Sequence, residues 1–174
     1  MNICSVNRPH KRCPFVRLSF VFPSSFFGPN SALHSCVECR QNTLATILFY
    51  TGCRVSEGLR LRGNDIILPD KVHISASKNS RDRTIHIVQN VVFFLYEFFQ
   101  YGCNFETIDY QNFYRFCQKM PAFAGHLKNG DNHSITHYFR KALIRRMYVD
   151  YRLNFDTIID FFGWKEKRSL LYYL

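Results

Sequence analysis

Apolar residues recur at helical spacing along most of the chain. Between Leu33 and Leu48 they fall on one face of an amphipathic helix, and Thr51-Gly52 supplies a glycine of the kind that commonly ends one. Residues 56–61 predict a second, short helix that stops near Gly63. The same spacing predicts further helices over residues 91–100, 110–119, 137–148, 155–162 and 165–173.

Three short segments with the pattern of strands interrupt the helices. They cover residues 66–68, 72–76 and 84–88, with turn-forming residues after the first (Pro69-Asp70) and after the second (residues 79–82). Strands joined by such short turns pair in antiparallel fashion. We therefore expect an α+β fold that is mainly helical, with a small three-stranded antiparallel sheet packed on a helical bundle, over residues 31–174.

The first 30 residues differ in composition from the remainder. They contain no acidic residue, and prolines at positions 14, 23 and 29 interrupt any long helix. We expect residues 1–30 to form a basic, poorly ordered segment. An organellar transit peptide, a basic arm that contacts DNA and the remnant of an upstream domain all fit this composition.

The charge of the chain points to a polyanionic partner. Its 174 residues include 23 lysines and arginines against 13 acidic residues, a formal net charge of +10. Part of this surplus precedes the first acidic residue, Glu38, and most of the remainder gathers in the C-terminal third. Such a surplus most often serves nucleic-acid binding, although a solvated basic surface has the same composition.

The apolar content excludes two classes of protein. With 47% hydrophobic residues, the chain has enough apolar material for a core, which excludes a disordered protein. Its longest apolar stretch, residues 91–96, is far shorter than the ~20 residues that cross a bilayer. A membrane-spanning protein is therefore excluded as well.

The seven cysteines do not have the spacing of a disulfide framework, and an odd number leaves one unpaired. A reducing, intracellular compartment fits this pattern better than a secreted one. Cys36 and Cys39 form a single CxxC pair, which Cys4, Cys13 and His34 could complete as a zinc site. Such sites normally have tighter spacing, so we expect no metal and no other cofactor.

Two segments place phosphate-binding side chains at the start of a predicted helix. Arg54 follows the glycine that ends the first helix, where its guanidinium group can reach into a cleft and bind a phosphate with two hydrogen bonds. Glu57 lies on the same face and can hold Arg54 in place, although an ordinary surface ion pair has the same spacing. His137 and Arg140 share one face of a later helix, whose N-terminus favours anions.

Two further segments carry less information by themselves. Lys78 lies at the expected tip of a hairpin, from which a lysine can donate a proton to a ligand, although solvated lysines are also common there. Trp164 follows Gly163 and precedes Tyr173 by nine positions. A lone tryptophan and a terminal tyrosine pair are more often packing residues.

In this order, the four segments resemble the catalytic domain of the tyrosine recombinases, the phage integrase family. That family carries a TGxRxSE box, a K(x)4R hairpin, an HxxR box, an LGH or LGW turn, and a tyrosine nine residues further on. The corresponding residues here are Thr51 to Glu57, Lys78 with Arg83, His137 with Arg140, and Trp164 with Tyr173. The resemblance spans residues 33–173.

The resemblance implies a site-specific recombinase or integrase that cleaves and rejoins DNA without metal or ATP. Tyr173 would attack the scissile phosphate and form a 3′-phosphotyrosyl bond, while Arg54 and Arg140 would bind the charge that grows on the phosphate oxygens. His137 would assist proton transfer from the tyrosine or bind the phosphate. Trp164 would donate its indole N–H to the same phosphate.

The resemblance also assigns the remaining roles and the partners. Lys78 would be the general acid on the leaving 5′-oxygen, and Glu57 would be a supporting residue. Tyr172 competes with Tyr173 as nucleophile, but the two point ~100° apart on a helix, and the spacing from Trp164 favours Tyr173. The implied partners are double-stranded DNA and further copies of the chain, in a tetramer on paired sites. Neither a membrane nor a small-molecule substrate is expected.

The chain departs from the family in some respects. Lys141 stands where members commonly have histidine, and Phe139 replaces the usual leucine. Members also carry an upstream DNA-clamping domain and often a tail beyond the tyrosine, so we expect this chain to represent the catalytic half alone. A type IB topoisomerase-like nicking-closing enzyme and a catalytically inactive, basic DNA-binding remnant stay open as alternatives.

Overall fold

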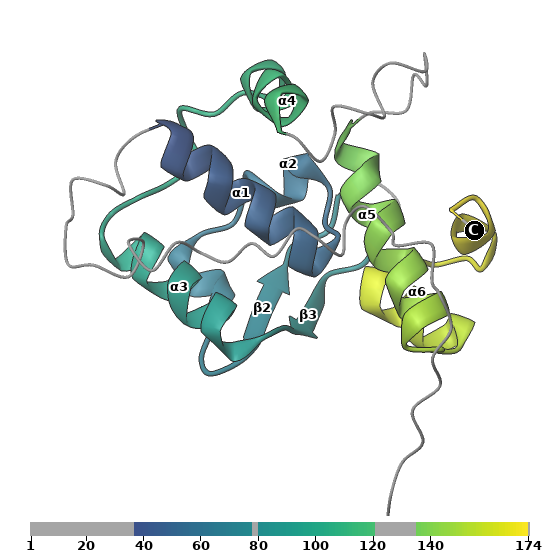
Figure 1. Cartoon of the computed structure of the whole chain (residues 1–174). Coiled ribbons are helices and arrows are strands. Elements are labelled where there is room, and N and C mark those ends of the chain that lie inside the picture. The colour runs from purple at the N-terminus through teal and green to yellow at the C-terminus, as the bar shows by residue number, and fades with distance from the viewer. Residues whose placement is uncertain (1–36, 78–79, 121–134, 174) are drawn as a thin grey trace, which may run out of the picture.

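Helices dominate the computed structural model, which describes residues 37–77, 80–120 and 135–173 (Figure 1). The helices are α1 (Val37–Thr51), α2 (Val55–Gly58), α3 (Gln89–Gln100), α4 (Tyr110–Lys119), α5 (Ile135–Arg145), α6 (Phe155–Phe162) and α7 (Arg168–Leu171). A 3₁₀ turn, η4 (Gly63–Asp65), precedes the sheet, and a π-helical turn, η6 (Arg146–Asp150), continues α5. The predicted segment 1–30 and most of the hypothetical zinc ligands (Cys4, Cys13, His34 and Cys36) lie outside the described residues.

The sheet has three short antiparallel strands in the order β1-β2-β3. They are β1 (Ile66–Ile67), β2 (Lys71–Ile74) and β3 (Arg83–His86), and Val72 pairs with Ile66 on one side and Ile85 on the other. Inward-facing residues of β2 and β3 alternate with more exposed ones, as the strand pleat requires. Helix α3 packs against β1 and β2. The predicted fold class is confirmed.

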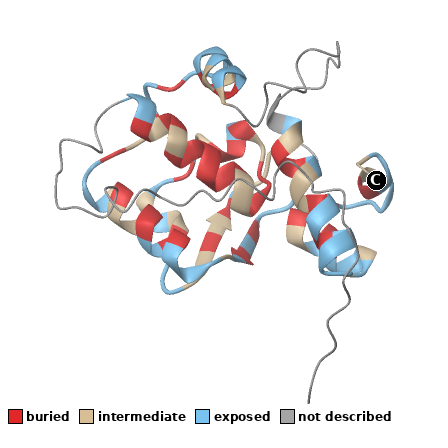
Figure 2. Cartoon of the chain, viewed as in Figure 1, coloured by how far each residue is buried: buried red, intermediate tan, exposed pale blue. Residues whose placement is uncertain are grey.

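Helix α1 runs through the interior and packs against α2 and α5 (Figures 1 and 2). Its residues Leu44, Ala45, Ile47 and Leu48 are fully buried. The helix ends at Gly52, which has a left-handed φ of 57° and lies so close to Phe162 that an added Cβ would be 2.5 Å from that ring. Glycine therefore lets the chain turn here and brings the end of α1 against α6.

Buried apolar side chains form two clusters that meet at α5. The first joins α1, the sheet, α3 and α4, and reaches Phe139 of α5. The second consists of Ile144, Met147, Ile158, Ile159, Phe162, Trp164 and Leu170. Because α5 contributes to both clusters, it fixes the C-terminal segment against the rest of the fold. In the described part of the chain, no helix has the length and apolar character that crossing a membrane requires.

The C-terminal segment differs from its prediction. The predicted helix over residues 165–173 is wrong in extent, because α7 is a single turn whose flanking N–H groups bond three residues back, as Tyr173 N does to Leu170 O (2.9 Å). Trp164, the residue before this predicted helix, forms an isolated β-bridge with Ser80. The helix predicted over residues 137–148 begins at Ile135 and changes to the π-helical turn at Arg146.

Candidate active site

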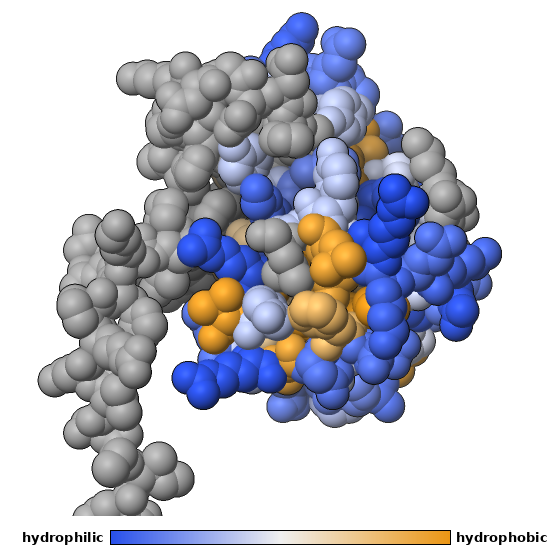
Figure 3. All heavy atoms as spheres, turned by 90° about the vertical axis from the view of Figure 1, so that its right-hand side faces the viewer, coloured by the Kyte–Doolittle hydropathy of each residue, from blue (hydrophilic) through white to orange (hydrophobic). Residues whose placement is uncertain are grey.

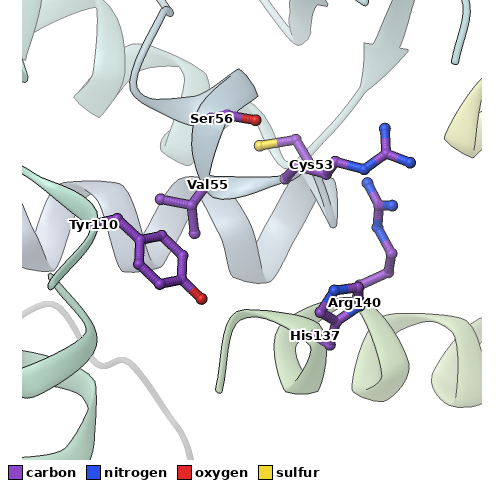
Figure 4. A pocket seen from close by; sticks show the side chains of 7 residues that line it. Cys53, Val55, Ser56, Tyr110, His137 and Arg140 are labelled. Carbon is purple, nitrogen blue, oxygen red and sulfur yellow. The ribbon is translucent and has the colours of Figure 1, made fainter. Parts of the chain in front are cut away.

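A cleft of about 240 Å³ opens between the segment after α1 and the first turns of α5 (Figure 4). Figure 4 shows His137 and Arg140 projecting from α5 toward this segment, with Tyr110 of α4 on another side. The lining residues are Cys53, Arg54, Val55, Ser56, Tyr110, His137 and Arg140. Three of the six site residues predicted from the sequence therefore line one cleft.

Arg54 lies at the N-terminus of α2, where its extended backbone (φ −71°, ψ 153°) begins the helix. Its backbone N–H donates to Oε2 of Glu57 (2.8 Å), and its side chain donates from Nη1 to Oε1 of the same carboxylate (3.3 Å). The predicted contact between Arg54 and Glu57 is thus confirmed. The side chain of Arg54 keeps 30% of its surface exposed and is accessible from the cleft.

Glu57 connects several elements although its own side chain has no exposed surface. Its Oε1 accepts hydrogen bonds from the hydroxyls of Ser77 (2.8 Å) and Ser80 (3.2 Å), and its Oε2 accepts one from Nη2 of Arg83 (3.1 Å). Burial raises the pKa of Glu57, but the Arg54 backbone N–H, the charge of Arg83 and the Ser77 hydroxyl outweigh burial and lower this pKa to about 2. The carboxylate is ionised at neutral pH.

Arg140 is held by three different contacts. Its Nε donates to the carbonyl oxygen of Gly52 (2.7 Å), its Nη2 is 3.7 Å from Oε2 of Glu57, and its guanidinium lies over the rings of Phe162 and Trp164, at 5.4 and 5.8 Å from their centroids. Burial lowers the pKa of Arg140, and the neighbouring Tyr173 and Glu57 oppose that effect. These contacts fix the orientation of the guanidinium at the cleft.

Tyr173 faces this cluster, whereas Tyr172 faces solvent. The phenolic oxygen of Tyr173 lies 3.2 Å from Nδ1 of His137, within hydrogen-bond distance. Its ring stacks on that of Trp164, with 5.4 Å between the centroids. Tyr172 is 79% exposed. Of the two tyrosines, the structure brings Tyr173 to His137.

Trp164 is buried, and its backbone is tied to the loop between β2 and β3. Besides the bridge from Trp164 to Ser80, the Arg81 N–H donates to the carbonyl of Gly163 (2.9 Å). Lys78, the remaining predicted site residue, lies outside the described residues. Its sequence neighbours Ser77 and Ser80 both bond Glu57, so this carboxylate holds the loop on either side of position 78.

Sequence reasoning missed three partners of Glu57: Ser77, Ser80 and Arg83. In the sequence, Arg83 was identified only as the arginine of the K(x)4R hairpin motif. One signal was present in the strand pattern, because Arg83 alternates with Thr84 and so shares the inward face of β3 with Ile85. A charged residue on the buried face of a strand requires a buried counter-charge.

The lysines and arginines of residues 135–173 divide into two groups. Arg140 is buried at the cleft. The others are exposed: Lys141, Arg145, Arg146, Arg152, Lys165, Lys167 and Arg168. Figure 3 shows the side of the molecule that carries α5, α6 and the C-terminal segment, where hydrophilic side chains surround a small apolar group. Exposed basic side chains of this kind suit contacts to a phosphate backbone.

Groups of three or more histidine, cysteine or acidic side chains that could hold a metal ion are not found among residues 37–77, 80–120 and 135–173. The four cysteines there are buried: Cys39, Cys53, Cys103 and Cys117. Burial raises the pKa of the Cys53 thiol to about 11, so this cysteine of the cleft is a poor nucleophile at neutral pH.

Comparison with known proteins agrees with the fold. The model of the phage integrase family matches residues 29–174, which is most of the chain. No curated protein matches it. The chain belongs to the phage integrase family, the tyrosine recombinases, a class of enzymes that break and rejoin DNA. The family predicted from the sequence is confirmed.

Proposed function

We propose that this chain is the catalytic domain of a site-specific recombinase or integrase that cleaves DNA through a 3′-phosphotyrosyl intermediate. The observation that carries the proposal is the position of Tyr173, whose phenolic oxygen is 3.2 Å from Nδ1 of His137. Arg140, one helical turn beyond His137, is linked through Glu57 to Arg54 across the cleft. A phenolic hydroxyl, an imidazole and two guanidinium groups thus lie close together, which supports the proposal.

In the cleavage step, the phenolic oxygen of Tyr173 attacks phosphorus and the bond to the 5′-oxygen breaks. His137 takes the phenolic proton, and Lys78 gives a proton to the 5′-oxygen that leaves. The phosphodiester is kept as an ester of tyrosine, so attack by a 5′-hydroxyl reverses the step without an energy source. Rejoining to a different strand's 5′-hydroxyl gives recombination.

Arg54 and Arg140 stabilise the charge that develops on the non-bridging phosphate oxygens. Each guanidinium is held in place before DNA binds, Arg54 by Glu57 and Ser77 and Arg140 by the Gly52 carbonyl. Cations that are already oriented need little reorganisation in the transition state, which makes them effective catalytic groups. Trp164 contributes its indole N–H to the same phosphate. In this mechanism the arginines carry out the charge stabilisation for which other enzymes use a metal ion.

We propose that the domain acts on paired DNA sites as a tetramer of identical chains, with the exposed basic residues of α5 and of the C-terminal segment on the DNA backbone. A topoisomerase of type IB would use the same cleavage chemistry but would rejoin the original strand. Strand exchange between two differently labelled duplexes separates the two activities.

The decisive experiment tests the nucleophile. The wild-type protein, Tyr173→Phe and Tyr172→Phe are incubated without added metal with a pool of nicked duplexes that are randomised around the nick. The nick lets the short cleaved fragment diffuse away, so the covalent adduct accumulates. We expect a denaturant-stable protein–DNA adduct with the wild type and Tyr172→Phe, and none with Tyr173→Phe. An adduct that survives in Tyr173→Phe, or its absence from the wild type, would contradict the proposal.

A further inference from the structure

We propose that Arg83 is a positioning residue for the strand cleavage: it is the dedicated counter-ion of Glu57, and it thereby leaves the charges of Arg54 and Arg140 available to the DNA phosphate. This inference rests on the proposed function and assigns a role to a side chain outside the cleft. Arg83 is not among the residues that line the cleft, and its side chain is only 5% exposed.

The distances around Glu57 rank its three arginines: the closest guanidinium nitrogen is 3.1 Å from the carboxylate in Arg83, 3.3 Å in Arg54 and 3.7 Å in Arg140. Nη2 of Arg83 is 3.1 Å from Oε2, whereas Nη2 of Arg140 is 3.7 Å from the same oxygen. Arg140 makes its shortest hydrogen bond elsewhere, from Nε to the Gly52 carbonyl. Arg83 is therefore the closest guanidinium to this oxygen, which it shares with the backbone N–H of Arg54 (2.8 Å), and the side chain of Arg140 binds the carboxylate more weakly.

Stability alone is a poor explanation for a guanidinium at this position. Nε and Nη1 of Arg83 are buried and have no hydrogen-bond partner in the part of the chain that the structure describes. A buried donor without a partner is costly, and a well-packed apolar residue usually serves stability as well as or better than a buried ion pair. The charge of Arg83 thus requires a reason other than packing.

The charges at the site supply that reason. Three guanidinium groups and one carboxylate leave a net charge of +2. A phosphodiester carries one negative charge, and attack by a phenolic oxygen that has lost its proton adds a second one at the pentacoordinate phosphorus. The charge of this cluster therefore matches the charge of the transition state more closely than it matches that of the bound substrate. Stronger stabilisation of the transition state than of the substrate is what accelerates a reaction. Without Arg83, the remaining two guanidinium groups and the carboxylate would carry a net charge of +1, equal in size to that of the bound phosphodiester.

The test compares cleavage rates of charge-altering and charge-keeping variants under single-turnover conditions, on the duplex that the wild type converts best from the randomised pool. We expect Arg83→Gln to cleave at least ~30-fold more slowly and Arg83→Lys to remain within ~5-fold of the wild type. Arg62→Gln removes the same charge from an exposed side chain that bonds the carbonyls of Leu59 and Leu61, and is expected to cleave like the wild type. Equal rates for Arg83→Gln and Arg62→Gln would overturn the proposal.

A second comparison separates a positioning role from a general loss of folding. If Arg83 acts through Glu57, then Glu57→Gln and the double variant with Arg83→Gln should cleave at rates within ~2-fold of each other. A further loss in the double variant would overturn the proposal, and this comparison holds even if Arg83→Gln alone does not fold. If the wild-type protein forms no covalent adduct with DNA, both the proposed function and the inference about Arg83 are refuted. If the wild-type adduct forms but the Arg83 variants do not behave as expected, only the inference about Arg83 is refuted.

Discussion

Nδ1 of His137 lies 3.2 Å from the phenolic oxygen of Tyr173, although 36 residues separate the two in the chain. Helix α5 provides the histidine, and the single turn α7 brings the tyrosine back to it. Trp164 supports the contact from the other side, because its ring stacks on that of Tyr173 and lies under the guanidinium of Arg140. The proposed nucleophile is therefore held by the same residues to which we assign phosphate binding.

Arg140 is expected to tolerate no replacement, lysine included. Its guanidinium bonds the Gly52 carbonyl through Nε and lies over two aromatic rings, and a lysine ammonium cannot do both and also bind a phosphate oxygen. We predict that Arg140→Ala and Arg140→Lys each reduce the single-turnover cleavage rate by ~10²–10³-fold. Arg62→Ala, which changes an exposed arginine that does not line the cleft, serves as control. A Lys variant that matches the wild type would contradict this prediction.

Lys78 is expected to be needed only when the leaving oxygen requires a proton. We predict that Lys78→Met slows cleavage of ordinary DNA by ~10²–10⁴-fold, the range of general acid catalysis. Replacing the bridging 5′-oxygen by sulfur should restore most of the rate, because a thiolate leaves without protonation. The measurement is the adduct yield over time with both duplexes, and Tyr173→Phe should be inactive on either. Equal losses on the two duplexes would show that Lys78 is not the general acid.

Glu57 should make stability depend on pH in the acid range. Its pKa in the folded protein is about 2, below the usual 4.5, so its contribution is complete above pH 4.5 and is lost as the pH falls toward 2. At 1.36 kcal/mol per pKa unit, the contribution amounts to about 3 kcal/mol. Between pH 6 and pH 2, the free energy of unfolding of the wild type should fall by about that much more than that of Glu57→Gln. Urea unfolding at several pH values measures both, and parallel curves would contradict the prediction.

Replacing Gly163 by alanine should destabilise the fold far more than the same change at Gly102, although both glycines have a positive φ. Gly163 ends α6 with φ 62°, and an added Cβ would be 2.8 Å from the carbonyl oxygen of Arg81, a backbone atom that cannot move aside cheaply. Gly102 has φ 72° but no heavy atom within 4 Å of such a Cβ. We predict that Gly163→Ala costs about 3 kcal/mol and Gly102→Ala about 1 kcal/mol in urea unfolding. Similar losses for the two variants would show that the contact with Arg81 is unimportant.

Most of the fold was accessible from local sequence patterns. The strands lie within or next to their predicted ranges, and residues 110–119 and 155–162 form the helices that were predicted. Turn residues, such as Gly52 and Gly163 with their left-handed backbone, mark where these helices end. Periodicity and turn chemistry are short-range properties, so they can be identified in one sequence. The last helix differed most from its prediction, and there the bridge between Trp164 and Ser80 and the burial of Leu170 tie the segment to the rest of the fold.

The site residues were predicted from their residue types and their characteristic spacings. The sequence by itself therefore determined the family to which the chain belongs. Tertiary structure decided which of them meet: Tyr173 and not Tyr172 lies at His137, and Arg83 joins Arg54 and Arg140 at one buried carboxylate. The burial of Arg83 could not be derived from spacing, because a buried charge is stable only when distant segments supply its partner. Local sequence patterns determine whether each segment forms a helix, a strand or a turn. The packing of α1, β3, α5 and the C-terminal turn against one another determines which side chains come into contact.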